Sequence, residues 1–179
     1  MKLYLICGKA RSGKDTFGRI LKKEEENNNK KVCILKLTAP LYRWLEDYFD
    51  YDSTKDEKPR ELLQTIGFDL LQIKLKKKDF LLDYLITTIE ILDNFYDVGI
   101  ITDGRLVHEI EVLKTKYPLI KTILLTNKKD NLLTEKEKKH KTETDLDSYK
   151  DFDYIVENKG IDNLLLKAEE IVGGRKWIK

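Results

Sequence analysis

The N-terminal segment of this 179-residue chain restricts its fold more than any other part of the sequence. Residues 3–7 form a continuous apolar run, which is typical of a β-strand buried on both faces of a sheet. Gly8 follows at once, and Gly13 and Lys14 complete the spacing G-x-x-x-x-G-K. Apolar residues at helical spacing continue from 17 to 21. The segment therefore predicts a buried strand, a glycine-bounded loop and an α-helix in direct succession.

The loop between this strand and this helix has the composition of an anion-binding site. Its glycines allow backbone N–H groups to converge on an anion, and the helix adds the positive end of its dipole. Lys14 supplies a cation for β- and γ-phosphates. Asp15 stands where the strict pattern has Ser or Thr, and we expect it to hold Mg²⁺ directly or through water, with Thr16 donating to the α-phosphate. The predicted nucleotide-binding residues are Gly8, Lys9, Ala10, Arg11, Ser12, Gly13, Lys14, Asp15 and Thr16.

Short apolar runs alternate with helical periodicities along the rest of the chain. Strands are expected at residues 3–7, 32–37, 98–102, 120–125 and 154–156. One helix is expected to begin near residue 59 and to continue to residue 73, and residues 24–31 are expected to form a polar loop. The alternation predicts a three-layer α/β fold with a five-stranded, mostly parallel sheet in a single domain of residues 1–179. Ligands of such folds bind outside the carboxyl ends of the strands.

The composition excludes several classes of partner. The chain has 34 basic and 32 acidic residues and a net charge of +2, so we expect no stable nucleic-acid complex. No apolar run approaches the roughly 20 residues of a membrane span, so no membrane association is expected. Cys7 and Cys33 lie in apolar runs, which favours two buried thiols in a reducing cytoplasm. Nothing in the sequence indicates an oligomeric state.

A carboxylate and a guanidinium follow the strand expected at residues 98–102. Asp103 stands at the strand end, where a carboxylate orients Mg²⁺ or its water shell in phosphate-loop proteins. Arg105 comes two residues later and can clamp a phosphate with its planar fork. A surface ion pair of Arg105 with Glu109 or with a neighbouring residue is the alternative. We predict catalytic roles for Lys14, Arg11, Asp103 and Arg105, and a Mg²⁺ site at Asp15 and Asp103.

Two further arginines are candidates for binding the acceptor of a phosphoryl group. Arg60 falls in the first turn of a helix, where the dipole disfavours a cation, so a role other than helix stability is expected. Arg43 is a second candidate of the same kind, and a solvated surface position is the alternative for both. Residues 126–149 are rich in lysine and predict either a solvated loop or a lid that closes over phosphates. His140 has no partner at ligand spacing and is expected to be a lid or surface residue.

Together these segments resemble the deoxynucleoside monophosphate kinases of phages and bacteria, within the P-loop nucleotide kinase group. The phosphate loop at residues 8–16 resembles that family's S-G-K-D-T loop, and residues 101–109 are similar to its D-x-R-F-x-N-E motif. Other similar segments are residues 38–41, 59–67, 140–143 (H-x-T-E) and 153–158 (D-Y-I-V-E-N). The chain departs from the family pattern at Tyr42, Phe68, Leu106, Val107, His108 and Thr142.

The resemblance implies a P-loop nucleoside-monophosphate-kinase-like fold with a mobile lid at about residues 126–149. It also implies ATP and Mg²⁺, transfer to a (deoxy)nucleoside 5′-monophosphate, and an acceptor-binding helical region at about residues 38–95. Arg43, Arg60 and Arg105 would then bind the acceptor. Two alternatives stay open: another small-molecule kinase, similar to phosphomevalonate or dephospho-coenzyme A kinases, and a nucleotide-binding protein without catalysis.

Overall fold

The computed structural model describes residues 1–52, 54–127 and 140–174. It divides into two compact units. The first comprises Met1–Leu35 and Leu92–Lys179, and the second comprises Lys36–Ile91. Each unit has a hydrophobic core of its own.

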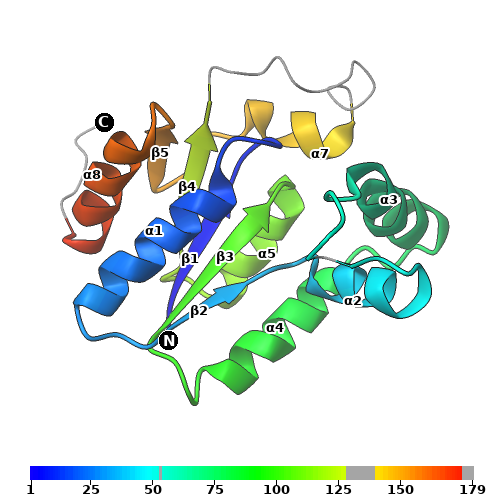
Figure 1. The fold of residues 1–179 in the computed structure, drawn as a ribbon, viewed down its shortest axis with the longest axis horizontal. Coiled ribbons are helices and arrows are strands. Elements are labelled where there is room, and N and C mark those ends of the chain that lie inside the picture. The colour runs from blue at the N-terminus through cyan, green and yellow to red at the C-terminus, as the bar shows by residue number, and fades with distance from the viewer. Residues whose placement is uncertain (53, 128–139, 175–179) are drawn as a thin grey trace. The chain divides into compact units, whose positions relative to one another are not determined.

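The first unit is built on a sheet of five parallel strands (Figure 1). The strands are β1 (Lys2–Cys7), β2 (Val32–Leu35), β3 (Val98–Gly104), β4 (Lys121–Thr126) and β5 (Tyr154–Glu157). Their order across the sheet is β2-β3-β1-β4-β5, so the N-terminal strand lies at the centre. All five lie where the apolar runs of the sequence predict them. Such runs have no polar face, so they are stable as strands only where both faces of the sheet are covered.

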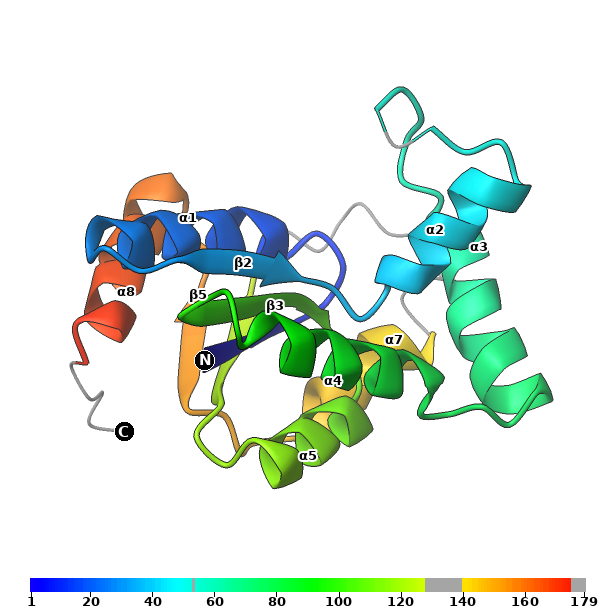
Figure 2. The ribbon, with the colours of Figure 1, turned by 90° about the horizontal axis from the view of Figure 1, so that it is seen from below.

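Helices cover both faces of this sheet. α1 (Lys14–Asn27) and α8 (Ile161–Val172) lie on one face, and α5 (Val107–Lys116) lies on the other (Figure 2). The short elements α7 (Lys141–Thr144) and η2 (Asp145–Ser148) precede β5. The core under α1 and α8 is formed by Tyr4, Ile6, Phe17, Leu21, Val32, Val98, Ile100, Ile123, Leu125, Val156, Leu164, Ala168 and Ile171. The predicted three-layer α/β fold is confirmed.

α1 is longer than the sequence predicts. The expected polar loop at residues 24–31 is wrong in its first part, because the helix continues to Asn27. Glu25 is buried there, and its carboxylate accepts hydrogen bonds from Tyr4 Oη at 2.6 Å and from Lys2 Nζ at 2.8 Å. Burial first, and then the Glu25 contact, raise the pKa of Tyr4, which keeps its hydroxyl protonated as a donor. A polar run therefore stays helical because the sheet supplies partners for its buried charge.

The second unit is helical. It contains α2 (Ala39–Tyr48), α3 (Arg60–Gln64), the π-helix η1 (Thr65–Lys74) and most of α4 (Phe80–Leu92). Its core is formed by Leu41, Leu45, Leu63, Ile66 and Leu71. The single helix expected from residue 59 to residue 73 is wrong in type, since only its first turn is α-helical and the rest is π-helical.

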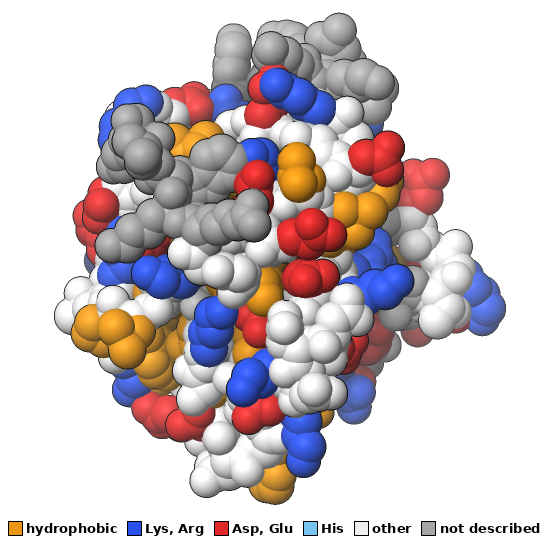
Figure 3. Space-filling view, turned by 90° about the vertical axis from the view of Figure 1, so that its left-hand side faces the viewer, with side chains coloured by type: hydrophobic (Ala, Val, Ile, Leu, Met, Phe, Trp, Pro, Cys, Tyr) orange, Lys and Arg blue, Asp and Glu red, His pale blue; other side chains and the backbone are white. Residues whose placement is uncertain are grey.

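The surface charges and the two cysteines are distributed as the composition predicts. On the face formed by α8 and β5, basic, acidic and apolar side chains are interspersed (Figure 3). Cys7 and Cys33 are both buried free thiols, as predicted. Among the described residues, no helix is both long enough and apolar enough to cross a bilayer.

A close contact between α1 and β3 gives a test of this packing. A Cβ added to Gly18 would lie 2.4 Å from Thr102 Cγ2. Alanine normally stabilises a helix interior by about 1 kcal/mol over glycine, but overpacking costs about 1–3 kcal/mol. We expect Gly18→Ala to lower the free energy of unfolding by up to about 2 kcal/mol, measured by urea denaturation.

The matched control removes the clashing methyl group. Thr102→Ser deletes Cγ2 but keeps the hydroxyl, so the double variant Gly18→Ala/Thr102→Ser should recover most of the lost stability. A stabilising effect of Gly18→Ala alone would contradict the close packing of α1 on β3.

Candidate active site

The site lies at the carboxyl ends of β1 and β3. These strands are paired in parallel until Cys7 stands opposite Gly104, and Gly8 N donates to Gly104 O at 3.3 Å. The phosphate loop, which follows β1, and the segment from Asp103 to Arg105 therefore emerge at the same edge of the sheet. This juxtaposition requires that β1 and β3 are neighbours in the sheet, and the observed strand order shows that they are.

Two glycines allow the loop to take its path. Gly8 has φ +149°, and a Cβ there would lie 2.3 Å from the backbone oxygen of Leu125. Gly13 has φ +99° and caps the N-terminus of α1, and a Cβ there would lie 2.6 Å from Asn158 Nδ2. Any side chain at either position would meet both backbone strain and a close neighbour. The G-x-x-x-x-G spacing thus reflects two separate steric requirements.

Asn158, which directly follows β5, holds the loop in place. Its Nδ2 donates to Ser12 O at 2.9 Å, while its own backbone N donates to Thr126 O at 2.8 Å. Its Oδ1 accepts from Gly160 N at 3.1 Å. Asn158 was not among the predicted site residues, although it ends the D-Y-I-V-E-N segment. It fixes the loop without contributing a charge.

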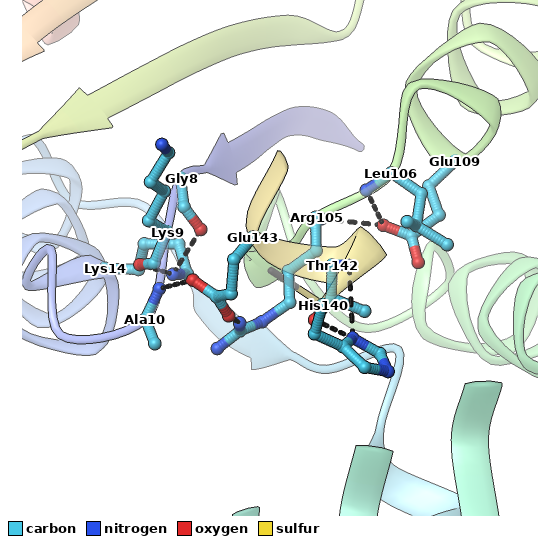
Figure 4. Close-up of polar contacts among 10 residues, drawn as sticks. All are labelled: Gly8, Lys9, Ala10, Lys14, Arg105, Leu106, Glu109, His140, Thr142 and Glu143. Carbon is cyan, nitrogen blue, oxygen red and sulfur yellow. Dashed lines mark hydrogen bonds and ion pairs between the residues drawn. The ribbon is translucent and has the colours of Figure 1, made fainter. Parts of the chain in front are cut away.

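Lys14 lies buried against its own loop. Its Nζ donates to Gly8 O at 2.6 Å and to Lys9 O at 2.7 Å (Figure 4). These two carbonyls hold the ammonium over the start of the loop. The cation that the sequence assigns to phosphates is thus bound in this structure by backbone oxygens of its own loop.

The predicted metal ligands stand on adjoining elements. Asp15 lies in the first turn of α1, and its Oδ1 accepts from Thr102 Oγ1 at 3.1 Å. Thr102 directly precedes Asp103 in β3. In the part of the chain that the structure describes, no group of three His, Cys, Asp or Glu side chains could hold a metal ion. In phosphoryl-transfer sites Mg²⁺ is held by one or two carboxylates and completes its coordination shell with phosphates and water. The two carboxylates of Asp15 and Asp103 fit this requirement.

Arg105 pairs with a residue that the sequence did not assign to it. Its guanidinium Nη1 contacts Glu143 Oε1 in an ion pair, while only its backbone N donates to Glu109, at 2.7 Å (Figure 4). The other oxygen of Glu143 accepts from Ala10 N at 2.6 Å. Arg105 therefore does form an ion pair with a neighbour in space, but that partner is the buried Glu143 and not a surface residue, and the pair connects the end of β3 to the phosphate loop.

Glu109 stabilises the backbone of the same segment. Its Oε2 accepts from the backbone N of Arg105 at 2.7 Å and of Leu106 at 2.9 Å, which orders the turn that leads into α5. Burial raises the pKa of Glu109 to about 7, although these two hydrogen bonds oppose the rise. Close to neutral pH this carboxyl is therefore partly protonated.

The segment of α7 and η2 is attached to these loops at further points. Asp145 Oδ2 accepts from Val107 N at 2.8 Å, and Asp147 forms an exposed ion pair with Lys9 at 2.9 Å. His140 Nδ1 accepts from Thr142 N at 3.3 Å and caps α7. Residues 128–139 of the expected lid lie outside the described residues.

A pocket of about 330 Å³ adjoins the loop. Its walls come from loop residues, including Arg11 and Ser12, from residues 124–127 at the end of β4, and from the segment that contains Leu146 and Tyr149. The buried Ser12 hydroxyl has no hydrogen-bond partner among the residues that the structure describes. Arg11 itself has φ +60° and an exposed side chain. The loop thus borders open space on the side of β4.

Arg43 and Arg60 belong to the second unit. Arg60 is the first residue of α3, as the sequence predicts. Arg43 lies on α2, is exposed, and donates from Nε to Asp47 at 3.0 Å, the pairing of an ordinary surface residue. Their roles toward an acceptor stay predictions.

A model of the family described as deoxynucleotide monophosphate kinase matches residues 51–168, more than half of the chain. The chain belongs to this family. The resemblance seen in the sequence is confirmed, and the protein is a nucleotide monophosphate kinase. The matched stretch includes Arg105, Glu109, Glu143 and Asn158 but begins after the phosphate loop, so the match and the loop are independent observations.

Solved structures show the same fold. Shikimate kinase from Aquifex aeolicus superposes with a TM-score of 0.51 at 18% identity, covering 97% of this chain and 97% of that chain. Shikimate kinase from Bacteroides thetaiotaomicron gives 0.52 at 14% identity, covering 98% and 99%. Shikimate kinase from Acinetobacter baumannii, solved with shikimate, gives 0.50 at 13% identity, covering 99% and 96%. Such low identities show the fold alone. None of the curated proteins matches the chain.

Glu109 gives this deoxynucleotide monophosphate kinase a defined pH dependence of stability. The unfolded carboxyl titrates near 4.5 and the folded one near 7, so between these values the native state binds more protons and its stability falls as the pH rises. Glu109→Gln keeps the neutral form at every pH. The free energy of unfolding of Glu109→Gln, relative to that of the wild type, should therefore increase as the pH rises from 4.5 to 8, by up to about 3 kcal/mol.

Urea denaturation of both proteins across this pH range measures the difference. Parallel stability curves for the variant and the wild type would show that Glu109 ionises normally in the native state.

Proposed function

We propose that this family member transfers the γ-phosphoryl group of ATP to a (deoxy)nucleoside 5′-monophosphate. One observation carries the proposal: a glycine-bounded loop with a buried lysine lies at the same sheet edge as Arg105, in a chain of this family. The open space beside the loop supports binding of the donor there. No protein nucleophile is required, because alignment and electrostatic stabilisation supply the rate of phosphoryl transfer.

The donor phosphates are assigned to the loop. Its backbone amides and the N-terminus of α1 would bind the β- and γ-phosphates, since both present partial positive charge to one volume. Lys14 would leave the Gly8 and Lys9 carbonyls and follow the transferred group, which spreads its charge in the transition state. Arg11, at the open side of the loop, is proposed to assist it.

Asp15 and Asp103 are the proposed holders of Mg²⁺. The bound ion would neutralise charge on the donor phosphates and orient them. Thr102 has a positioning part in this site, because its hydroxyl fixes the Asp15 carboxylate against the end of β3.

The acceptor phosphate is assigned to arginines. Arg105 lies beside the phosphate loop through its contact with Glu143, and a planar guanidinium suits a phosphate better than an ammonium does. Arg60 and Arg43, in the helical region at about residues 38–95, are also proposed to bind the acceptor, on the family resemblance. The segment at about residues 126–149 is proposed as the lid of a single kinase domain.

Lys14→Ala tests the donor site. Loss of this charge should reduce kcat at least 100-fold, the scale of losing one preorganised stabiliser of the transition state. Lys22→Ala is the matched control, because Lys22 lies on the same helix in a partly exposed pair with Glu26. It should leave kcat within about twofold of the wild type. Equal activity of Lys14→Ala and the wild type would remove Lys14 from the mechanism.

A panel of ribo- and deoxyribonucleoside 5′-monophosphates with radiolabelled ATP and Mg²⁺ tests the acceptor. Formation of a labelled diphosphate from at least one of them is the expected result. Product only from non-nucleotide phosphorylated acceptors would support the small-molecule kinase alternative. ATP binding without product from any acceptor would support a nucleotide-binding protein without catalysis.

A further inference from the structure

Glu143 connects two parts of the site that are far apart in the sequence. One carboxylate oxygen accepts from the backbone N of Ala10 in the phosphate loop, and the other pairs with the guanidinium of Arg105 after β3 (Figure 4). The Glu143 side chain is 2% exposed, and that of Arg105 is 24% exposed. A single buried carboxylate is thus shared between the groups assigned above to the donor and to the acceptor.

A buried carboxylate in this position must keep both partners. Burial of an unpaired charge is strongly unfavourable, so the geometry is stable only while Ala10 N and Arg105 both engage it. The orientation of the guanidinium relative to the loop is therefore fixed by one side chain. An arginine held in this way loses less rotational freedom when a phosphate binds.

The backbone that carries Glu143 is itself attached to the same loops. Asp145 accepts from Val107 N, two residues after Arg105, and Asp147 pairs with Lys9, next to Ala10. The three acidic residues alternate along α7 and η2, so the segment contacts both loops at more than one point. Glu143 therefore lies in a segment that has further contacts with both loops.

Arg105 keeps binding capacity after this contact. A guanidinium has five N–H donors in a planar fork, and the pair with Glu143 engages Nη1. The remaining donors and the exposed part of the side chain can bind a phosphate while Glu143 holds the other edge. The carboxylate and the phosphate can therefore bind Arg105 together.

We infer that Glu143 is a positioning residue: it fixes Arg105 against the phosphate loop, so that the acceptor phosphate is aligned with the donor. The inference rests on the proposed function. Glu143 acts through Arg105 and touches no reacting atom, so its effect belongs in kcat and in the use of the acceptor. ATP affinity depends on the other loop amides and on Lys14, and it should change little.

A double-mutant cycle with Arg105 tests this role. Glu143→Gln keeps an oxygen for Ala10 N and removes the charge that pairs with Arg105. We expect kcat to fall about 10- to 100-fold, the scale of losing alignment, with the Kd for ATP within about threefold of the wild type. In an Arg105→Met background, Glu143→Gln should cost no more than about a further twofold.

Glu111→Gln is the matched control, because it makes the same substitution at an exposed carboxylate of α5 that has no part in the site. It should leave kcat within about threefold of the wild type. Should Glu143→Gln fail to fold, Glu143→Asp keeps the charge but withdraws it by one methylene, and the same loss of kcat is expected.

Two kinetic outcomes would overturn the inference. If Glu143→Gln lowers kcat equally with and without Arg105, the residue merely supports the fold. If it increases ATP affinity or kcat, the carboxylate competes with phosphate instead of positioning the arginine.

A readout independent of activity separates this inference from the proposed function. The ¹⁵N resonance of the Arg105 side chain should show hindered guanidinium rotation in the wild type and free rotation in Glu143→Gln. If this holds while no nucleoside monophosphate is phosphorylated, the proposed acceptor is wrong and the positioning role stands. Equal rotation rates in the two proteins would refute the positioning role whatever the acceptor.

Discussion

The parallel pairing of β1 with β3 is the constraint on which the site depends. Because the register brings Cys7 opposite Gly104, the chain leaves both strands at one edge of the sheet. A phosphate loop follows one strand and Asp103 and Arg105 end the other. Parallel strands place their carboxyl ends together wherever they are neighbours, and this geometry concentrates polar chemistry at a single edge.

Polar side chains from later parts of the chain then fix these two loops. Asn158 binds the phosphate loop, Glu109 orders the turn at Arg105, and Glu143 connects the two. Each satisfies backbone N–H or C=O groups that would otherwise be buried without partners. The loops can therefore be irregular and still hold a defined shape, which is what a preorganised anion site requires.

The fold and the family of this protein rest on different likenesses to other proteins. Two shikimate kinases share the fold at 18% and 14% identity over nearly the whole chain, and a likeness at such low identity extends to the fold alone. The family match covers the second unit from residue 51 onward, and also β3 and Arg105, which follows it. The family therefore rests on the part of the chain that contains Arg105 and Glu143, whereas the phosphate loop lies outside the matched residues.

The sequence alone determined the strands, the phosphate loop and most helices, because each depends on neighbours along the chain. A continuous apolar run must be covered on both faces, and two glycines bounding a loop permit a path that other residues resist. The positions of Asp103 and Arg105 at a strand end, and of Arg60 at the start of α3, follow from the same local patterns.

Only the tertiary structure decided which partners hold the charges. Glu25 extends α1 through a polar run because Tyr4 and Lys2 reach it from β1. The guanidinium of Arg105 pairs with Glu143, which is 38 residues away in the sequence, and not with Glu109, which is four residues away. The reason is that the chain returns to the site after β4. A carboxylate's partner is set by distance in space, and sequence spacing carries that information only within a helix or a turn.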